Sequence, residues 1–280
     1  MLCGVIIAQE SQDYREALKA LSLKAEEGDA KALYELGRLH DTGFDTIPVD
    51  TARSSALYLL SANKGYAPAQ NYIGFRYYNG EGIAQNLDSA IYWIKAAAAQ
   101  GDITAASNIG YLLLDSPEIP HDTIEALNWL EIAAEGGVRD AQIKLVELRK
   151  DYWRTLPADS ALVRGMKLYL GRAPLVGVKL LERAAEENNP KALALLGDAY
   201  SNGRGIPYDH QKSVEFFYEA ALAGNPSAQF IIAELLEFFP DDLPDSSTTA
   251  TFWYEKAAEA GITDSETAYR LLYTIPEIIP

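Results

Sequence analysis

A tandem repeat constrains the fold of this 280-residue chain more than any other feature of its sequence. Each Ala-rich segment ends at a glycine or an asparagine, which we call the anchor. Successive anchors lie 37, 36, 36, 51, 36 and 37 positions apart. The anchors are Gly28, Gly65, Gly101, Gly137, Asn188, Gly224 and Gly261. Alanine stands three positions before every anchor and four positions after all but the last. A period near 36 residues predicts an array of one supersecondary unit.

Each anchor is predicted to end one helix and to precede the next. The residue after the last turn of a helix adopts left-handed backbone angles, which glycine favours and asparagine tolerates. Four anchors are followed by a residue suited to cap the next helix: Asp29, Asp102, Asn189 and Asn225. Glycine recurs nine positions after several anchors, inside a helix where it costs about 1 kcal/mol relative to alanine, so a close helix contact is expected there. Since no alternating pattern long enough for a buried strand remains, we predict an all-α fold.

Several motifs resemble those of Sel-one-like repeats, which are relatives of tetratricopeptide repeats. The resemblance rests on the repeat motif from Ala90 to Gly110, NGEGIAQN (Asn79–Asn86), NGRGIP (Asn202–Pro207) and FWYEKAAEAG (Phe252–Gly261). It covers about residues 11–273. The resemblance implies a right-handed superhelical α-solenoid of about seven stacked helix-turn-helix repeats. We interpret the NGxG motifs as turns and not as phosphate-binding loops, because they recur at one place in the repeat.

Residues 1–10 and 274–280 flank the predicted array. The apolar segment Leu2–Ala8 precedes a polar run, so it is interpreted as the remnant of a signal peptide cleaved after Ala8, although no basic segment precedes it. That interpretation predicts a periplasmic bacterial protein. The alternative is a frayed apolar terminus on a cytoplasmic protein.

The step of 51 residues marks an irregularity near residues 151–171, where Ala161–Leu170 is predicted to form an additional helix. In one interpretation, a repeat has decayed and this helix fills a gap in the stack. In the other, the insertion projects and shapes a partner site. The residues that would suit such a site are Trp153, Arg154, Arg164, Lys167, Tyr169 and Arg172.

Composition excludes several classes of function. Lys and Arg number 24 against 40 Asp and Glu, a net charge of −16, which argues against a nucleic acid partner. Cys3 is the single cysteine, the three histidines are far apart, and no apolar stretch is long enough to span a membrane. Neither a phosphate-binding loop nor a nucleophile elbow is present. We therefore expect no metal, no cofactor and no enzymatic activity.

A protein partner is expected on the concave face of the solenoid, which the first helix of each repeat lines. Positions seven and ten after each anchor are predicted to lie on one exposed face of that helix. Aromatic and amide groups occupy these positions in the N-terminal half, and acids follow later. The predicted partner-binding residues are Arg38, Tyr72, Phe75, Asn108, Tyr111, Glu147, Asp198 and Glu234. Aromatic anchors with nearby acids suit a partner with a basic surface.

Three functions follow from the resemblance, in order of preference. The first is a non-enzymatic adaptor or scaffold for protein–protein interaction. The second is an immunity protein that binds and inhibits a bacterial toxin or lipase effector. The third is a hydrolase activity, which the resemblance implies only through a secreted subgroup linked to penicillin binding. That subgroup carries a disulfide in each repeat, and this chain has one cysteine.

Overall fold

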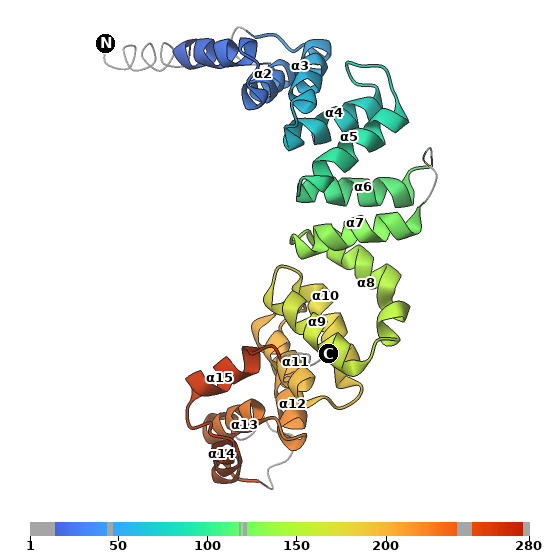
Figure 1. Ribbon diagram of the computed structural model, residues 1–280. Coiled ribbons are helices and arrows are strands. Elements are labelled where there is room, and N and C mark those ends of the chain that lie inside the picture. Colours follow the sequence, from blue (N-terminus) through green and yellow to red (C-terminus); the bar gives the residue numbers. More distant parts are fainter. Residues whose placement is uncertain (1–14, 44–46, 118, 120–121, 240–247, 277–280) are drawn as a thin grey trace, which may run out of the picture. The chain divides into compact units, whose positions relative to one another are not determined.

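Helices are the only extended regular elements in the computed structural model, which describes residues 15–43, 47–117, 119, 122–239 and 248–276 (Figure 1). The predicted all-α fold of stacked repeats is therefore confirmed. The described residues form two compact units, one through Ile132 and the other from Ala133. The predicted signal remnant and Cys3 lie outside the described residues.

The first unit starts with a helix over residues 15–26 and continues as consecutive packed helices. In order they are α2 (Ala30–Thr42), α3 (Thr51–Asn63), α4 (Ala67–Asn79), α5 (Leu87–Ala99), α6 (Ile103–Asp115) and α7 (Thr123–Glu135). The end of α7 extends past the boundary at Ile132. Helices α2, α4 and α6 each follow an anchor glycine and are the first helices of their repeats.

The second unit contains eight labelled helices, of which α8, α11, α13 and α15 follow an anchor. They are α8 (Arg139–Arg154), α9 (Ala158–Leu170), α10 (Pro174–Ala185), α11 (Pro190–Asn202), α12 (His210–Leu222), α13 (Pro226–Phe238), α14 (Ala250–Glu259) and α15 (Ser265–Tyr273). The last helix, α15, packs against α13 and also reaches α11.

Backbone geometry at the anchors confirms their predicted role. All six anchor glycines have positive φ, and Asn188, with φ of 55°, is the one non-glycine residue with positive φ among the described residues. The predicted caps also form: the Asp29 carboxylate accepts the Ala32 N–H at 2.7 Å, and Asp102 accepts that of Ala105 at 2.9 Å. Asn189 and Asn225 cap α11 and α13 in the same way.

The recurrent glycine of the first helix lies against the second helix of its repeat, as predicted. A Cβ added at Gly74 would lie 2.5 Å from Cγ1 of Ile94 and 3.2 Å from the carbonyl oxygen of Ala90. Equivalent atoms at Gly37 and Gly110 would lie 2.9 Å from the Tyr58 ring and 2.7 Å from Leu130. The two helices approach too closely for any side chain at this position.

A glutamine five positions after three of the anchors joins the two helices around the turn, a feature that sequence analysis missed. Gln70 Nε2 donates to the carbonyl of Ala62 at 3.2 Å. Gln142 and Gln229 donate to the equivalent alanine carbonyls at 3.3 and 3.2 Å. Each of these carbonyls lies at the C-terminal end of a helix and also accepts the backbone N–H of the anchor glycine, so the glutamine supplies a second donor.

The NGxG motifs form turns, as interpreted from the sequence. Gly80 and Gly203 end α4 and α11 in left-handed conformation. The second glycine of each motif lies against the first turn of another helix, α3 for Gly82 and α10 for Gly205. A Cβ at Gly82 would be 2.1 Å from the Thr51 carbonyl oxygen, and one at Gly205 would be 2.6 Å from that of Pro174. The loops are thus packing elements of the stack.

The irregular segment forms the predicted additional helix, α9, which begins three residues earlier than expected. It crosses α10 closely, with Gly165 and Gly177 at the crossing. Helix α9 does not project as one interpretation expected, because it packs along α10 and its Tyr169 is fully buried. Helix α9 is part of the helix stack, because its apolar face packs against α10.

Candidate protein-binding face

The first helices of three successive repeats carry five of the eight predicted partner-binding residues. Side chains of α4 contact both α2 and α6, and we call the surface of these three helices the α2–α4–α6 face. The predicted residues on these helices are Arg38, Tyr72, Phe75, Asn108 and Tyr111. All five belong to the first unit.

An aromatic cluster holds Tyr72 on this face. The Tyr72 ring centroid lies 5.6 Å from that of Tyr34, edge to face, and 5.3 Å from that of Tyr58. Tyr34 also contacts Tyr66 edge to face. Burial raises the pKa of Tyr34 to about 12, and the pKa of the fully buried Tyr58 is raised by burial and by its hydrogen bond to Asp41. Tyr72 itself is 43% exposed, so it is fixed in place and still available for contact.

A pocket of about 320 Å³ opens beside Tyr72. Phe75 from the same helix and Asn108 from α6 line it, together with Asn71 and Thr104. The Asn108 Nδ2 donates to Asn71 Oδ1 at 3.2 Å, which ties α6 to α4. Three of the predicted residues therefore line one pocket that offers an aromatic wall and two amide groups.

The two other predicted residues of this unit lie outside that lining. Arg38 is exposed and pairs with Glu35 on its own helix at 3.4 Å. Such an exposed ion pair holds its partners weakly, so the guanidinium remains available to a ligand. Tyr111 is half-buried on α6.

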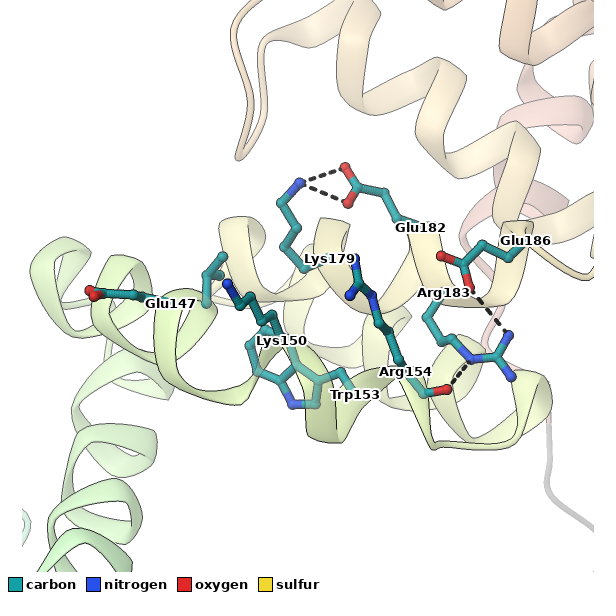
Figure 2. Close-up of a pocket in the computed structure, with 9 residues that line it drawn as sticks. Glu147, Lys150, Trp153, Arg154, Lys179, Glu182, Arg183 and Glu186 are labelled. Atoms are coloured by element: carbon teal, nitrogen blue, oxygen red, sulfur yellow. Dashed lines mark hydrogen bonds and ion pairs between the residues drawn. The ribbon is translucent and has the colours of Figure 1, made fainter.

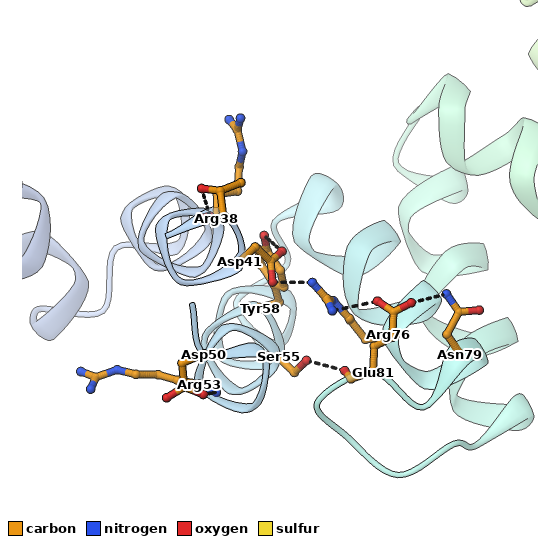
Figure 3. Close-up of polar contacts among 10 residues, drawn as sticks. Arg38, Asp41, Asp50, Arg53, Ser55, Tyr58, Arg76, Asn79 and Glu81 are labelled. Atoms are coloured by element: carbon orange, nitrogen blue, oxygen red, sulfur yellow. Dashed lines mark hydrogen bonds and ion pairs between the residues drawn. The ribbon is translucent and has the colours of Figure 1, made fainter. Parts of the chain in front are cut away.

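An ion-pair network at the edge of the pocket was not predicted (Figure 3). The Arg76 guanidinium lies between two carboxylates: it contacts Asp41 of α2 and pairs with Glu81 of the following loop at 2.8 Å. Asp41 also accepts the Tyr58 hydroxyl at 2.8 Å, and Ser55 donates to the backbone carbonyl of Glu81 at 2.8 Å. With two acids around one arginine, this edge of the face carries an excess of negative charge.

The acids predicted for the later repeats are placed differently from expectation. Asp198 is 2% exposed, so the prediction that it lies on an exposed face is wrong. Its carboxylate accepts the hydroxyls of Tyr169 and Tyr273 at 2.6 and 2.8 Å and the Asn202 amide at 2.9 Å. The physical reason is that α9 and α15 both pack at α11 and cover this position.

The remaining acids differ from each other in exposure. Glu234 of α13 is half-buried and accepts the hydroxyl of Ser265 at the start of α15. Glu147 of α8 is exposed, with Lys144 at 3.9 Å. An exposed run of acids along the second unit is therefore not present at these three positions.

No group of three or more His, Cys, Asp and Glu side chains is arranged to hold a metal ion within the described ranges. In that same part of the chain, none of the helices has both the length and the apolar character needed to cross a membrane.

Helix pairs that repeat every 36 or 37 residues, each closed by a left-handed anchor, define a tetratricopeptide-like repeat protein. The Sel1 repeat model matches residues 30–66, 67–102, 103–138, 171–189, 190–225 and 226–262, and the chain belongs to this family. Six segments match where about seven repeats were predicted. The short match at 171–189 covers α10 alone. Helices α8 and α9 lie between two matched segments and belong to neither.

Named relatives come from bacteria and fungi. The chain is 30% identical to the uncharacterized protein NMB1327 of Neisseria meningitidis serogroup B, over 82% of this chain and 45% of that protein. It is 24% identical to chitin synthase regulatory factor 4 of Schizosaccharomyces pombe, over 83% of this chain and 42% of that protein. The chain thus spans less than half the length of these curated relatives. Among solved structures, c5321, a protective antigen of uropathogenic Escherichia coli with an SLR fold, is 26% identical over 91% of this chain and 58% of that chain, with a TM-score of 0.45.

Proposed function

We propose that this protein is a non-enzymatic adaptor or scaffold that binds a protein partner on the α2–α4–α6 face. The pocket beside Tyr72 carries the proposal, because it combines a fixed but exposed aromatic ring with Phe75 and the amide of Asn108. Aromatic side chains held rigidly on a surface are frequent anchors of protein interfaces. Sel1 repeats generally mediate protein interactions, which agrees with this role.

A partner with a basic surface fits this face best. The chain carries a net charge of −16, and Asp41 and Glu81 outnumber Arg76 beside the pocket. Charge of one sign around a binding face accelerates association with a partner of the other sign, and salt screens that effect. We therefore expect capture of the partner to weaken as salt is raised.

An inhibitory role is the second candidate, in which the captured partner is a basic toxin or lipase effector and this chain is its immunity protein. The net charge favours this candidate as well, since it suits the capture of a basic enzyme. The two roles are separated by assaying the captured partner. Loss of its enzymatic activity on binding supports immunity, whereas an unchanged or non-enzymatic partner supports a scaffold.

The test is capture of partners from a lysate of the native host at low and high salt, followed by mass spectrometry. Tyr72→Ala combined with Tyr111→Ala is expected to reduce capture at least tenfold, because it removes the aromatic anchor of α4 and a second predicted aromatic contact on α6. Each ring contact of Tyr72 is worth about 0.5–1.5 kcal/mol, so the melting temperature should fall by only a few degrees.

Tyr92→Ala is the matched control, because Tyr92 is 64% exposed on α5, away from this face. It should leave capture unchanged. Undiminished capture by the double variant would disprove the proposed site. A collapse of the melting temperature in that variant would instead place the two tyrosines in the core.

A further inference from the structure

A second pocket lies in the other unit, between α8 and α10 (Figure 2). Its volume is about 330 Å³. Lys150, Trp153 and Arg154 line it from α8, and Lys179, Glu182 and Arg183 face them from α10. None of these residues belongs to the α2–α4–α6 face, so the pocket is not explained by the proposed function.

The pocket exists because α8 is longer than the other first helices. Helices α2, α4, α6, α11 and α13 all end fourteen positions after their anchors, whereas α8 continues for three more residues to Arg154. Trp153 and Arg154 both lie in this additional turn. Arg183 of α10 fixes the turn, because its Nε donates to the carbonyl oxygen of Arg154 at 3.0 Å.

The indole of Trp153 holds a hydrogen-bond donor without an acceptor. The side chain is buried, with 4% of the residue exposed, and its Nε1 has no partner within the described part of the chain. Two of the other tryptophans have acceptors: Trp129 Nε1 donates to Glu125 at 3.1 Å, and Trp253 Nε1 donates to Thr248 at 2.9 Å. A buried donor left unpaired is unfavourable, and its N–H gives a signal that reports on the lining of this pocket.

The cations of the two helices differ in how far they are neutralised. On α10, Lys179 donates to both carboxylate oxygens of Glu182 at 2.7 and 2.8 Å, and Arg183 pairs with Glu187 at 2.5 Å. On α8, Lys150 has no ion pair within the described ranges. Arg154 pairs with Asp151 at 3.4 Å between two exposed side chains, and such a pair is weak.

These unsatisfied groups lie together on one side of α8. Lys150, Trp153 and Arg154 are spaced three and four residues apart, which places them on one helix face. The lining contains four cations and three acids, whereas the whole chain has 24 cations and 40 acids. The local charge is thus opposite in sign to that of the molecule.

We propose that this pocket binds a protein segment in which an acidic side chain stands next to an apolar one. The carboxylate pairs with Lys150 and Arg154, which have no strong ion pair of their own among the described residues. The apolar neighbour rests on the indole and on the aliphatic stems that line the pocket. Recognition here is independent of the basic partner expected on the α2–α4–α6 face.

The test follows the indole N–H signal of Trp153 by NMR in the full chain labelled with ¹⁵N. The signal is assigned with Trp153→Phe, or by through-bond experiments if that variant does not fold. The probe is acetyl-Leu-Asp-Leu-amide, and acetyl-Leu-Asn-Leu-amide is its uncharged match. We expect a saturable shift with the Asp peptide and at least tenfold weaker binding of the Asn peptide. An unmoved signal, or equal binding of the two peptides, would overturn the proposal.

Two further experiments test whether the binding is specific to this pocket and to peptides. Lys150→Gln is expected to weaken binding of the Asp peptide at least fivefold, whereas Lys256→Gln, at an exposed lysine paired with Glu259, should leave it unchanged. An Asp-peptide affinity that is insensitive to Lys150→Gln would contradict the proposed ion pair. Sodium acetate and inorganic phosphate test free anions. A saturable shift with either at the same concentration would make this a small-anion site and not a peptide site.

Discussion

Asn188 occupies the anchor position that every other repeat gives to glycine. Its φ of 55° lies in the left-handed region, which costs an ordinary L-residue roughly 1–2 kcal/mol and costs asparagine less. The residue is exposed, so its effect on stability comes from the backbone and not from packing. Position and residue type were both readable from the sequence, because the requirement is local.

Substitution at this anchor separates backbone conformation from side-chain contacts. Asn188→Ala should lower the free energy of unfolding by about 1 kcal/mol, because alanine lacks the side chain that tolerates left-handed angles. Asn188→Gly should stay within about 0.5 kcal/mol of the parent chain. Urea denaturation measures both. An alanine variant as stable as the glycine variant would show that the turn does not impose this strain.

Lys191 is a half-buried cation that the sequence did not single out. It lies in the first turn of α11, and its ammonium donates to the carbonyl oxygen of Leu271 near the end of α15. Burial lowers its pKa to about 8. Between pH 8 and the ordinary lysine value near 10.4, the folded chain has lost a proton that the unfolded chain still holds. Stability therefore rises with pH in this window.

Tyrosines act in the opposite direction at higher pH. Burial raises the pKa of Tyr34 and Tyr254 to about 12, so the unfolded chain loses these protons first and stability falls above about pH 10. We expect the free energy of unfolding to be higher at pH 9.5 than at pH 7.5. In Lys191→Met the rise should disappear, and in Lys212→Met, at an exposed lysine, it should persist. Urea titrations at the two pH values decide this, and a rise retained in Lys191→Met would contradict the assignment.

At the scale of elements, the crossing of α9 and α10 departs most from the repeat pattern. A Cβ added at Gly177 would lie 2.3 Å from the Tyr169 backbone nitrogen, whereas one at Gly165 would lie 3.1 Å from that of Leu181. Backbone atoms cannot move aside as side chains do. The same crossing places the Tyr169 hydroxyl on Asp198, so the packing of α9 decides which acid of α11 is buried.

The two glycines of this crossing should therefore differ in their tolerance of alanine. Gly177→Ala is expected to cost about 3 kcal/mol or to prevent folding of the second unit, because the helices must separate. Gly165→Ala should cost about 1 kcal/mol, since a shift of a few tenths of an ångström relieves it. Thermal melting followed by circular dichroism ranks the two. A Gly165 variant that is the less stable of the pair would show that the closest approach of the two helices is at Gly165 and not at Gly177.

At the scale of the whole molecule, the chain divides into two compact units with the boundary next to the irregular repeat. In a repeat protein each unit contacts mainly its neighbours, so stability is close to a sum of local terms. A local defect should then affect nearby helices more than distant ones. The net charge of −16, in contrast to stability, is not a local property. Its long-range effect on the rate of association depends on the charges of the whole chain.

Hydrogen exchange can measure how local the stability is. Gly74→Ala places a Cβ against Ile94 and should destabilise α4 and α5 by about 1–3 kcal/mol despite the better helix propensity of alanine. Amide exchange followed by mass spectrometry should accelerate in α4 and α5 and remain unchanged in α11 and α12. Uniform acceleration across both units would show that the chain unfolds as one cooperative body.

The sequence by itself determined the repeat, the helix ends at the anchors, the caps that follow them, and the approximate position of the additional helix. These features depend on residues close together in the chain, and each has a conformational requirement that few residue types satisfy. The pocket beside Tyr72 was partly predictable, because Tyr72, Phe75 and Asn108 recur at repeat positions that place them on one face.

Only the tertiary structure decided which residues at these positions remain exposed. Asp198 follows the same spacing as Phe75, yet it is buried because α9 and α15 pack over α11. The network around Arg76 and the pocket at Trp153 depend likewise on contacts between separate helices and on one additional turn of α8. Periodicity assigns a residue to a face of its own helix, but the burial of that face depends on which helices pack against it.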